Sequence, residues 1–378
     1  MKRAAGLALT ALLLGACAST PESGKPAPLA TFTKELTIKS AWSKPMGAWD
    51  AAPQGDVRPV LVGEKLFVVD GKHWLRAYQA RGGKLLWERR LGGEISAGIT
   101  AAGEVLLLGT RQAEVLALSQ KDGAPVWRTS VSSEVLAPPA AGEDMVVIRA
   151  GDGKIAALNL HDGVQRWVVE RPVPSLTLRG IGAAVITDGV VYAGFANGKL
   201  LALSLRDGAV QWETVVAQPQ GRSELERMVD VDARPLPLDD TVYAAAYHGR
   251  VTAVSRSNGR VLWPREVSTY TDLAYDNDNI YVCDEEGRLW ALDRRSGSAL
   301  WKQEQLHYRA VSAPVVFGDY LVVADVEGYL HWLARSDGHL AGRYHISDRG
   351  VVGTPLVADD LLYAVGADGT ITALRARR

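Results

Sequence analysis

Seven tryptophans recur along this chain at nearly even spacing, and six of them stand four residues after a glycine. Successive members are 45, 40, 40, 45, 51 and 38 residues apart: Trp42, Trp87, Trp127, Trp167, Trp212, Trp263 and Trp301. A period near 40 that persists through such changes in length indicates one supersecondary unit copied along the chain. The repeat therefore constrains the architecture directly, and it predicts that most of the conspicuous residues serve the fold.

Each copy of the unit has the same internal layout. Two turn motifs, such as Asp152-Gly153 and Asp162-Gly163, lie about ten residues apart and enclose an alternating apolar stretch. Asp-Gly and Asn-Gly favour the positive φ angles of two-residue hairpins. An apolar run such as Lys65–Val69 precedes the first turn, and a further short strand, often opened by proline, lies upstream of it. Each copy thus predicts four short strands, which we name A to D.

Four-stranded antiparallel units of this period are typical of β-propeller blades. The turn between strands B and C occurs eight times, at Asp70-Gly71, Arg111-Gln112 (a degenerate form), Asp152-Gly153, Asn197-Gly198, His248-Gly249, Glu286-Gly287, Glu327-Gly328 and Asp368-Gly369. We therefore predict an all-β, eight-bladed propeller of four-stranded antiparallel blades over residues 34–378.

The two ends of the repeat are incomplete in complementary ways. The last copy ends at Arg378 without its tryptophan strand, and Trp42 has no strands A to C before it. We expect the segment Leu36–Ser43 to complete the last blade, which closes the ring and removes an exposed sheet edge. The seventh copy departs from the pattern because Gly342 stands where the tryptophan is expected, and we predict that Tyr344 fills that space.

The first 33 residues lie outside the repeat. A short basic start is followed by an apolar stretch over residues 6–14, which is too short to span a bilayer. It ends in Leu14-Gly-Ala-Cys17, which resembles a bacterial lipobox and implies cleavage before a lipidated Cys17; the alternative is a chance cysteine in an ordinary secretory signal. Ala18 then favours the outer membrane. We predict a signal peptide over 1–16 and a lipidated flexible tether over 17–33.

Composition and motifs give little support to catalysis. The net charge of −1 becomes −3 once two signal-peptide cations are removed, which favours neither nucleic acid nor acidic lipid as a partner. The chain has no H-E-x-x-H, C-x-x-C or G-x-S-x-G motif, and Gly151–Ala156, which matches G-x-G-x-x-A, leads into a strand instead of a helix. We expect Cys283 to be buried and inert, and we predict no catalytic, cofactor or metal site.

The tryptophan-ended repeats resemble the quinoprotein (pyrroloquinoline quinone) propeller family, which raises an enzymatic alternative. That resemblance would imply a quinone-dependent periplasmic dehydrogenase. Several of those enzymes carry a vicinal Cys-Cys pair and a calcium ligand set, whereas Cys283 is unpaired in this sequence. The repeat tryptophans are expected to be packing residues between blades.

Two long insertions interrupt the repeat, after Trp167 and after Trp212. Both occupy the connection from strand D to the next strand A, and such connections leave a propeller on one face. The first insertion carries Leu176, Leu178 and Arg179, and the second carries Asp230 and Asp232. Apolar anchors with flanking charge suit a protein-docking patch. The alternative is that the leucines simply begin strand A and are buried.

The chain as a whole resembles the BamB family, the lipoprotein scaffolds of the outer-membrane β-barrel assembly machinery. The resemblance rests on the lipobox, the eight repeats and the motifs Pro174–Gly180, Glu224–Asp232 and Glu327–Trp332. It implies a non-catalytic, lipid-anchored protein at the periplasmic face of the outer membrane that binds the POTRA domains of BamA. Nascent outer-membrane proteins are a further candidate partner. The family's contact residues carry over onto Leu176, Leu178, Arg179, Asp230 and Asp232. The proline-rich stretch Arg234–Pro237 departs from the family pattern.

Overall fold

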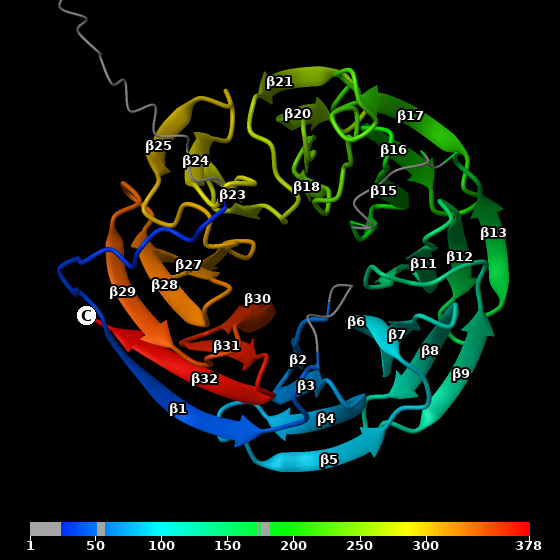
Figure 1. Cartoon of the computed structure of the whole chain (residues 1–378). Coiled ribbons are helices and arrows are strands. Elements are labelled where there is room, and N and C mark those ends of the chain that lie inside the picture. The colour runs from blue at the N-terminus through cyan, green and yellow to red at the C-terminus, as the bar shows by residue number, and fades with distance from the viewer. Residues whose placement is uncertain (1–23, 51–56, 173, 175–181) are drawn as a thin grey trace, which may run out of the picture.

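The computed structural model describes residues 24–50, 57–172, 174 and 182–378. Eight four-stranded antiparallel sheets surround a central axis (Figure 1). The predicted eight-bladed all-β propeller is therefore confirmed, and we number the blades along the chain from the sheet that follows Trp42.

The strands of the first four blades follow one another in sequence order within each sheet. They are β2 (Val60–Val62), β3 (Lys65–Val69), β4 (Trp74–Gln79) and β5 (Leu85–Arg90); β6 (Ile95–Ala102), β7 (Val105–Thr110), β8 (Glu114–Ser119) and β9 (Pro125–Ser130); β10 (Ala140–Gly142), β11 (Met145–Arg149), β12 (Ile155–Asn159) and β13 (Gln165–Val169); β14 (Val185–Thr187), β15 (Val190–Gly194), β16 (Lys199–Ser204) and β17 (Val210–Val215).

The remaining four blades follow the same scheme, except that the first strand of the chain, β1, completes the eighth. They are β18 (Leu236–Leu238), β19 (Thr241–Ala245), β20 (Val251–Ser255) and β21 (Val261–Arg265); β22 (Ala274–Tyr275), β23 (Asn279–Cys283), β24 (Leu289–Asp293) and β25 (Ala299–Gln303); β26 (Val315–Phe317), β27 (Tyr320–Ala324), β28 (Tyr329–Ala334) and β29 (Leu340–His345); β30 (Val351–Ala358), β31 (Leu361–Gly366), β32 (Thr370–Arg377) and β1 (Thr37–Pro45).

Closure of the ring by the N-terminus is confirmed. Strand β1 pairs antiparallel with β32, from Thr37 opposite Arg377 to Pro45 opposite Thr370. The chain reaches β1 after residues 24–36 cross blades six and seven to the outer edge of the ring (Figure 1), and Ala27 N donates to His307 O at 2.9 Å. The described part of the predicted tether is therefore attached to the propeller.

The repeat tryptophans join neighbouring blades. Six of the seven donate their indole N–H to a backbone carbonyl of the next blade at 2.8–3.2 Å. The indole also lies on the glycine of the next blade's C–D turn. A Cβ on Gly163 would come within 2.6 Å of Trp127, and its φ of +70° also favours glycine. The Gly-x-x-x-Trp motif therefore serves two blades at once.

The hairpins between strands B and C are longer than predicted. Strand β11 ends at Arg149 and β12 begins at Ile155, so five residues separate them instead of two. Gly153 still has a positive φ of +86° near the end of this loop. The dipeptide therefore marks the turn correctly but not its length, because the loop begins before the dipeptide and continues after it.

Blade seven carries its junction tryptophan on strand C instead of strand D. In blade three, Ala157 of strand C lies opposite Trp167 of strand D, and in blade seven the order is reversed, with Trp332 opposite Gly342. Trp332 is fully buried, whereas Tyr344 is only partly buried at the edge of the same cluster. The prediction that Tyr344 fills the space of the missing tryptophan is wrong. Trp332, on the neighbouring strand β28, packs at the junction between blades seven and eight instead.

The reason for this reversal lies in the ring closure. A tryptophan on β29 would need the glycine of a C–D turn in blade eight, but β1 joins that blade from the other end of the chain. Leu36 and Ile38 lie there instead. A Cβ on Gly342 would come within 2.9 Å of Ile38 and 3.3 Å of Leu36. Glycine in strand D therefore makes room for the closing segment.

Candidate docking face

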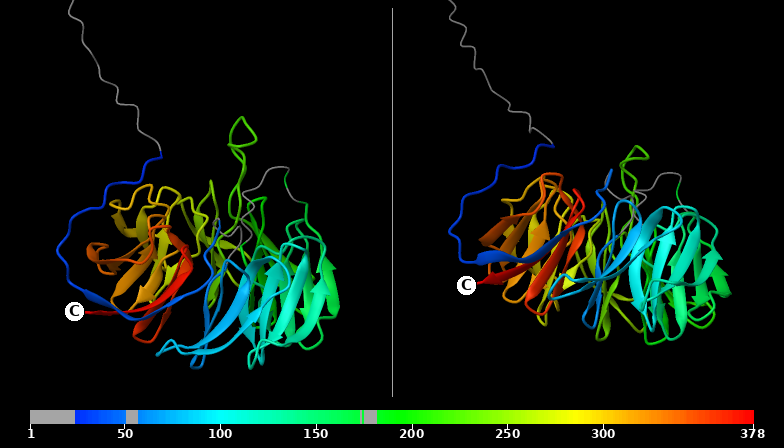
Figure 2. Two further views of the ribbon diagram at one scale, coloured as in Figure 1. Left: turned by 60° about the horizontal axis from the view of Figure 1, so that its bottom comes forward. Right: turned by 90° about the horizontal axis from the view of Figure 1, so that it is seen from below.

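The strand order within a blade determines which loops share a face. Strands A to D run alternately up and down, so every B–C turn and every D–A connection leaves the propeller at the same end. The connection between β17 and β18 rises from this end as the tallest projection of the ring (Figure 2). We call this end of the propeller the docking face.

The outer half of that connection is a small, self-capped turn. Glu226 Oε2 accepts the backbone N–H groups of Arg222 at 2.6 Å and Ser223 at 3.2 Å, and Ser223 Oγ accepts Glu226 N–H at 3.2 Å. These reciprocal bonds resemble a capping box and hold the turn in one shape. They also lower the pKa of the Glu226 carboxyl. Leu225, within this capped turn, is 63% exposed.

The inner half of the connection is built into the ring. Val229 forms an isolated β-bridge with Asn197 of blade four, and Asp230 forms one with Tyr247 of blade five. The segment therefore links these two blades. Val231 N–H donates to Phe195 O at 3.2 Å. Because Val229 and Val231 are buried, the tip stands on a rigid base.

The two predicted aspartates lie at this base, together with an arginine from blade three. Asp230 is fully buried and Asp232 is half-buried. Burial and the neighbouring Asp230 raise the pKa of Asp232 to about 8, while the Arg149 guanidinium opposes the rise. Burial also lowers the pKa of Arg149 to about 10, although the two aspartates favour its charged form. The three groups form one electrostatically coupled cluster beneath the docking face.

The end of the first insertion, the connection after Trp167, contacts the same cluster. Arg149 Nη1 donates to Gly182 O at 2.6 Å, and a Cβ on Gly182 would come within 2.3 Å of Asp232 O. The connections after Trp167 and Trp212 therefore meet at Gly182 and Asp232. The predicted contact residues Leu176, Leu178 and Arg179 lie outside the described residues.

Two members of this region were missed by sequence reasoning. Leu225 is an apolar residue within a charged run, and an isolated leucine among arginines and glutamates is a usable sign of an exposed anchor. Arg149 ends an ordinary apolar strand, β11, and only its position near Gly182 and Asp232 gives it a role. No local signal in the sequence distinguishes it from the other arginines.

The described part of the chain shows few features of a metal site or a reactive cysteine. Those residues contain no group of three or more histidine, cysteine or carboxylate side chains that could hold a metal ion. Cys283 is buried and free, and burial raises the pKa of its thiol well above the ordinary value. Within the same described ranges, no helix has the length and apolar character needed to cross a membrane.

The fold defines a tryptophan-repeat β-propeller with a rigid, projecting loop at one end of the ring. A family model described as outer membrane protein assembly factor BamB matches residues 37–108, 71–303 and 306–378. The chain belongs to this family.

Individual relatives agree with this assignment. The outer membrane protein assembly factor BamB of Kangiella koreensis is 39% identical over 97% of this chain and 95% of that protein. The Pseudomonas aeruginosa protein of the same name is 38% identical over 100% of this chain and 99% of its own length. The crystal structure of BamB from Moraxella catarrhalis superposes with a TM-score of 0.81 at 26% identity, covering 90% of this chain and 100% of that one. The predicted resemblance to BamB is thereby confirmed, and it favours a non-catalytic assembly factor over the dehydrogenase alternative.

Proposed function

We propose that this chain is a lipid-anchored, non-catalytic scaffold that assists the assembly of outer-membrane β-barrel proteins and binds the POTRA domains of BamA through the docking face. The observation that carries the proposal is the meeting of two long connections, at Gly182 and Asp232, on one end of the ring. The relatives named above are all outer membrane protein assembly factors.

The chemistry of the second connection suits protein binding. Leu225 offers an exposed apolar side chain with charged neighbours on both sides, and apolar anchors within a polar rim carry most of the energy of many interfaces. The capped tip and the buried base mean that little conformational entropy is lost when a partner binds.

We assign the predicted contact residues two different parts. Leu176, Leu178 and Arg179 belong, with Leu225, to the surface that contacts the partner. Asp230 is fully buried, so we give it and Asp232 a supporting part, in which the cluster with Arg149 holds the two connections in register. Replacing Asp230, the fully buried member, would then weaken binding by displacing the loops.

The N-terminal segment supports a peripheral position at the membrane. Arg309 Nη1 donates to Ala27 O at 2.7 Å and Arg343 Nη2 donates to Ala30 O at 3.1 Å, which attaches the segment to blades six and seven. A lipidated Cys17 lies seven residues before Gly24, so its reach is at most about 25 Å. We infer that blades six and seven face the periplasmic surface of the outer membrane.

Calorimetric titration of the mature protein with purified POTRA domains tests the docking face. We expect Arg179→Glu and Leu225→Asp each to weaken binding by at least about tenfold, as for truncation of a central interface residue. Val164→Asp is the matched control, because Val164 is 53% exposed and lies beside a C–D turn on the opposite face. Unchanged affinity in both docking-face variants, with an unchanged Tm, would place the interface elsewhere.

A further inference from the structure

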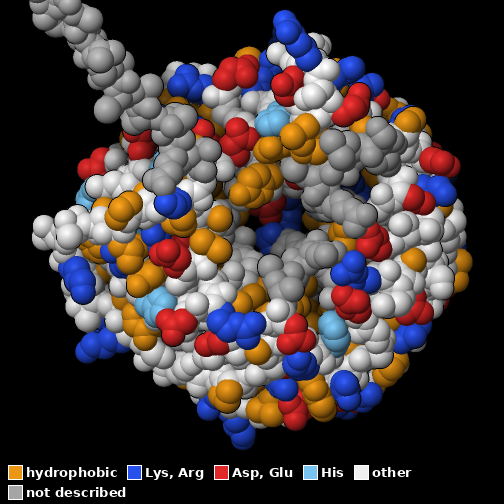
Figure 3. All heavy atoms as spheres, in the orientation of Figure 1, with side chains coloured by type: hydrophobic (Ala, Val, Ile, Leu, Met, Phe, Trp, Pro, Cys, Tyr) orange, Lys and Arg blue, Asp and Glu red, His pale blue; other side chains and the backbone are white. Residues whose placement is uncertain are grey.

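The central channel of the propeller contains a hollow that the docking face does not use. It lies among the A strands of blades one, five, six, seven and eight and has a volume of about 440 Å³. Prolines lead several of these strands and present rigid apolar walls, together with Leu236, Leu273, Val315 and Leu356. Figure 3 shows the face hollowed at its centre, with basic side chains in the depth.

A group of three charged residues crosses the channel beside this hollow. Arg58 of blade one lies with Nη2 3.0 Å from Asp272 Oδ2, next to blade six, and Arg234 of blade five has its Nε 3.9 Å from the same oxygen. The backbone N–H of Arg234 also donates to Asp272 Oδ1 at 2.8 Å. Burial opposes ionisation of Asp272, but the two guanidinium groups outweigh it and lower the pKa of this carboxyl. One carboxylate therefore faces two cations.

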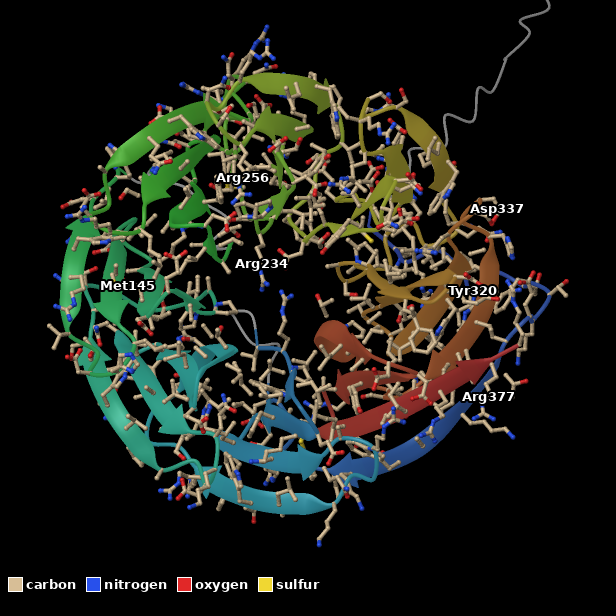
Figure 4. All side chains as sticks on the ribbon, turned by 180° about the vertical axis from the view of Figure 1, so that it is seen from behind. Met145, Arg234, Arg256, Tyr320, Asp337 and Arg377 are labelled. Atoms are coloured by element: carbon tan, nitrogen blue, oxygen red, sulfur yellow. The ribbon has the colours of Figure 1, made fainter. Side chains whose placement is uncertain are left out.

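Arg234 is the member with unused binding capacity. Its Nε is buried and has no hydrogen-bond acceptor among the described residues, and its side chain is 39% exposed. It borders a second hollow of about 190 Å³ toward blades two to four as well as the large one. Figure 4 shows Arg234 reaching into the open centre of the ring. A guanidinium carries five N–H donors in a fixed plane, which suits a bidentate carboxylate.

An incompletely paired guanidinium at the edge of an apolar hollow selects for one kind of ligand. The cation requires an anionic group, and the proline and leucine walls favour an apolar group attached to it. We propose that the channel binds the carboxylate of a small apolar acid, with Arg234 holding the carboxylate and the hollow holding the apolar part. The volume lies in the range of small-molecule sites in proteins.

The competing explanation is that the three residues form only a structural bridge across the channel. The two explanations predict different effects on carboxylate affinity when the charge of Asp272 is removed. If the group exists to bind an anion, Asp272 competes with the ligand for Arg234, so removing its charge strengthens binding. If the group is only a bridge, neither Asp272 nor Arg234 affects the affinity for added carboxylates.

Calorimetry of the mature chain with a short series of probes tests the proposal. Hexanoate represents a free acid and N-acetyl-alanyl-leucine a peptide terminus, while hexanol lacks the charge and inorganic phosphate lacks the apolar part. We expect both carboxylates to bind and hexanol and phosphate not to bind; the tighter carboxylate identifies the natural source. Equal binding of hexanoate and hexanol, or of hexanoate and phosphate, overturns the assignment.

Variants then locate the site. Arg234→Gln should weaken hexanoate binding about tenfold or more, as expected for loss of a charge-assisted hydrogen bond, and Asp272→Asn should strengthen it. Arg111→Gln is the matched control, because Arg111 is a half-buried arginine with its own ion pair to Glu94 at 3.2 Å. Weaker binding in Asp272→Asn, or unchanged binding in a folded Arg234→Gln protein, refutes the proposal. Neither result bears on POTRA binding, since the channel is separate from the docking-face tip.

Discussion

The reversed tryptophan of blade seven gives a demanding test of how the ring is closed. Trp332 is fully buried, so Trp332→Ala should cost about 3–5 kcal/mol of unfolding free energy. Gly342→Trp restores the residue that the other blades have in strand D. It should nevertheless destabilise, because even a Cβ there comes within 2.9 Å of Ile38. Overpacking of this kind typically costs about 1–3 kcal/mol and more for a large side chain.

The double variant Trp332→Ala/Gly342→Trp separates the two explanations of this blade. If the tryptophan has only moved between equivalent places, the double variant should be as stable as the parent. If Leu36 and Ile38 already fill the space beside Gly342, as the structure indicates, the double variant should be no more stable than Trp332→Ala alone.

Thermal unfolding followed by near-UV circular dichroism measures the difference. Each kcal/mol shifts Tm by about 2–4 °C in domains of about 150–250 residues, and by less in larger ones, so we expect a loss of several degrees. Trp332→Phe, which keeps most of the buried area, should lose less. Recovery of the parental Tm by the double variant would refute the reasoning about closure.

Three further predictions concern the anchor, the closing strand and the buried cluster. Cys17→Ala should leave the protein in the soluble fraction of the envelope, and a processed variant that still sediments with outer membranes in high salt would rule out lipid anchoring. A chain truncated through Pro45 should melt well below one that begins at Thr33, because it loses β1 and the burial of Trp42, which is worth about 3–5 kcal/mol; equal Tm values would contradict closure by β1. Asp232 has a raised folded-state pKa of about 8, so the folded protein retains a proton that the unfolded chain releases near pH 4, and stability should fall as pH rises between these values. Asp232→Asn should therefore match the parent near pH 4 and exceed its Tm by pH 8, and parallel Tm curves would show that this carboxyl is ordinary.

The blade architecture could be predicted from the sequence because its signals are local. A turn dipeptide, a strand of alternating apolar residues and a tryptophan four residues after a glycine each act within one blade or between neighbours. Eight copies reinforce one another, so the degenerate turn at Arg111-Gln112 and the missing strand of the last copy could still be placed. The closing role of the segment before Ser43 followed from counting strands.

The position of the docking face was also accessible, since it needs only the alternation of strand directions. The parts played by its residues were not. Burial of Asp230 and its coupling with Asp232 to Arg149 depend on Arg149 of blade three meeting the connections before blades four and five near Gly182. Nothing in the local pattern of Asp230 distinguishes a buried support from an exposed contact.

The sequence by itself determined the fold class, the blade count and the order of the loops, because backbone hydrogen bonding and turn geometry act over a few residues. Only the tertiary structure decided where Trp332 packs, how Arg149 is used and that Arg58 meets Asp272 across the channel. The last two residues are 214 positions apart, and ring closure alone brings them to 3.0 Å. Contacts of this kind depend on the whole ring, so no segment of the chain encodes them separately.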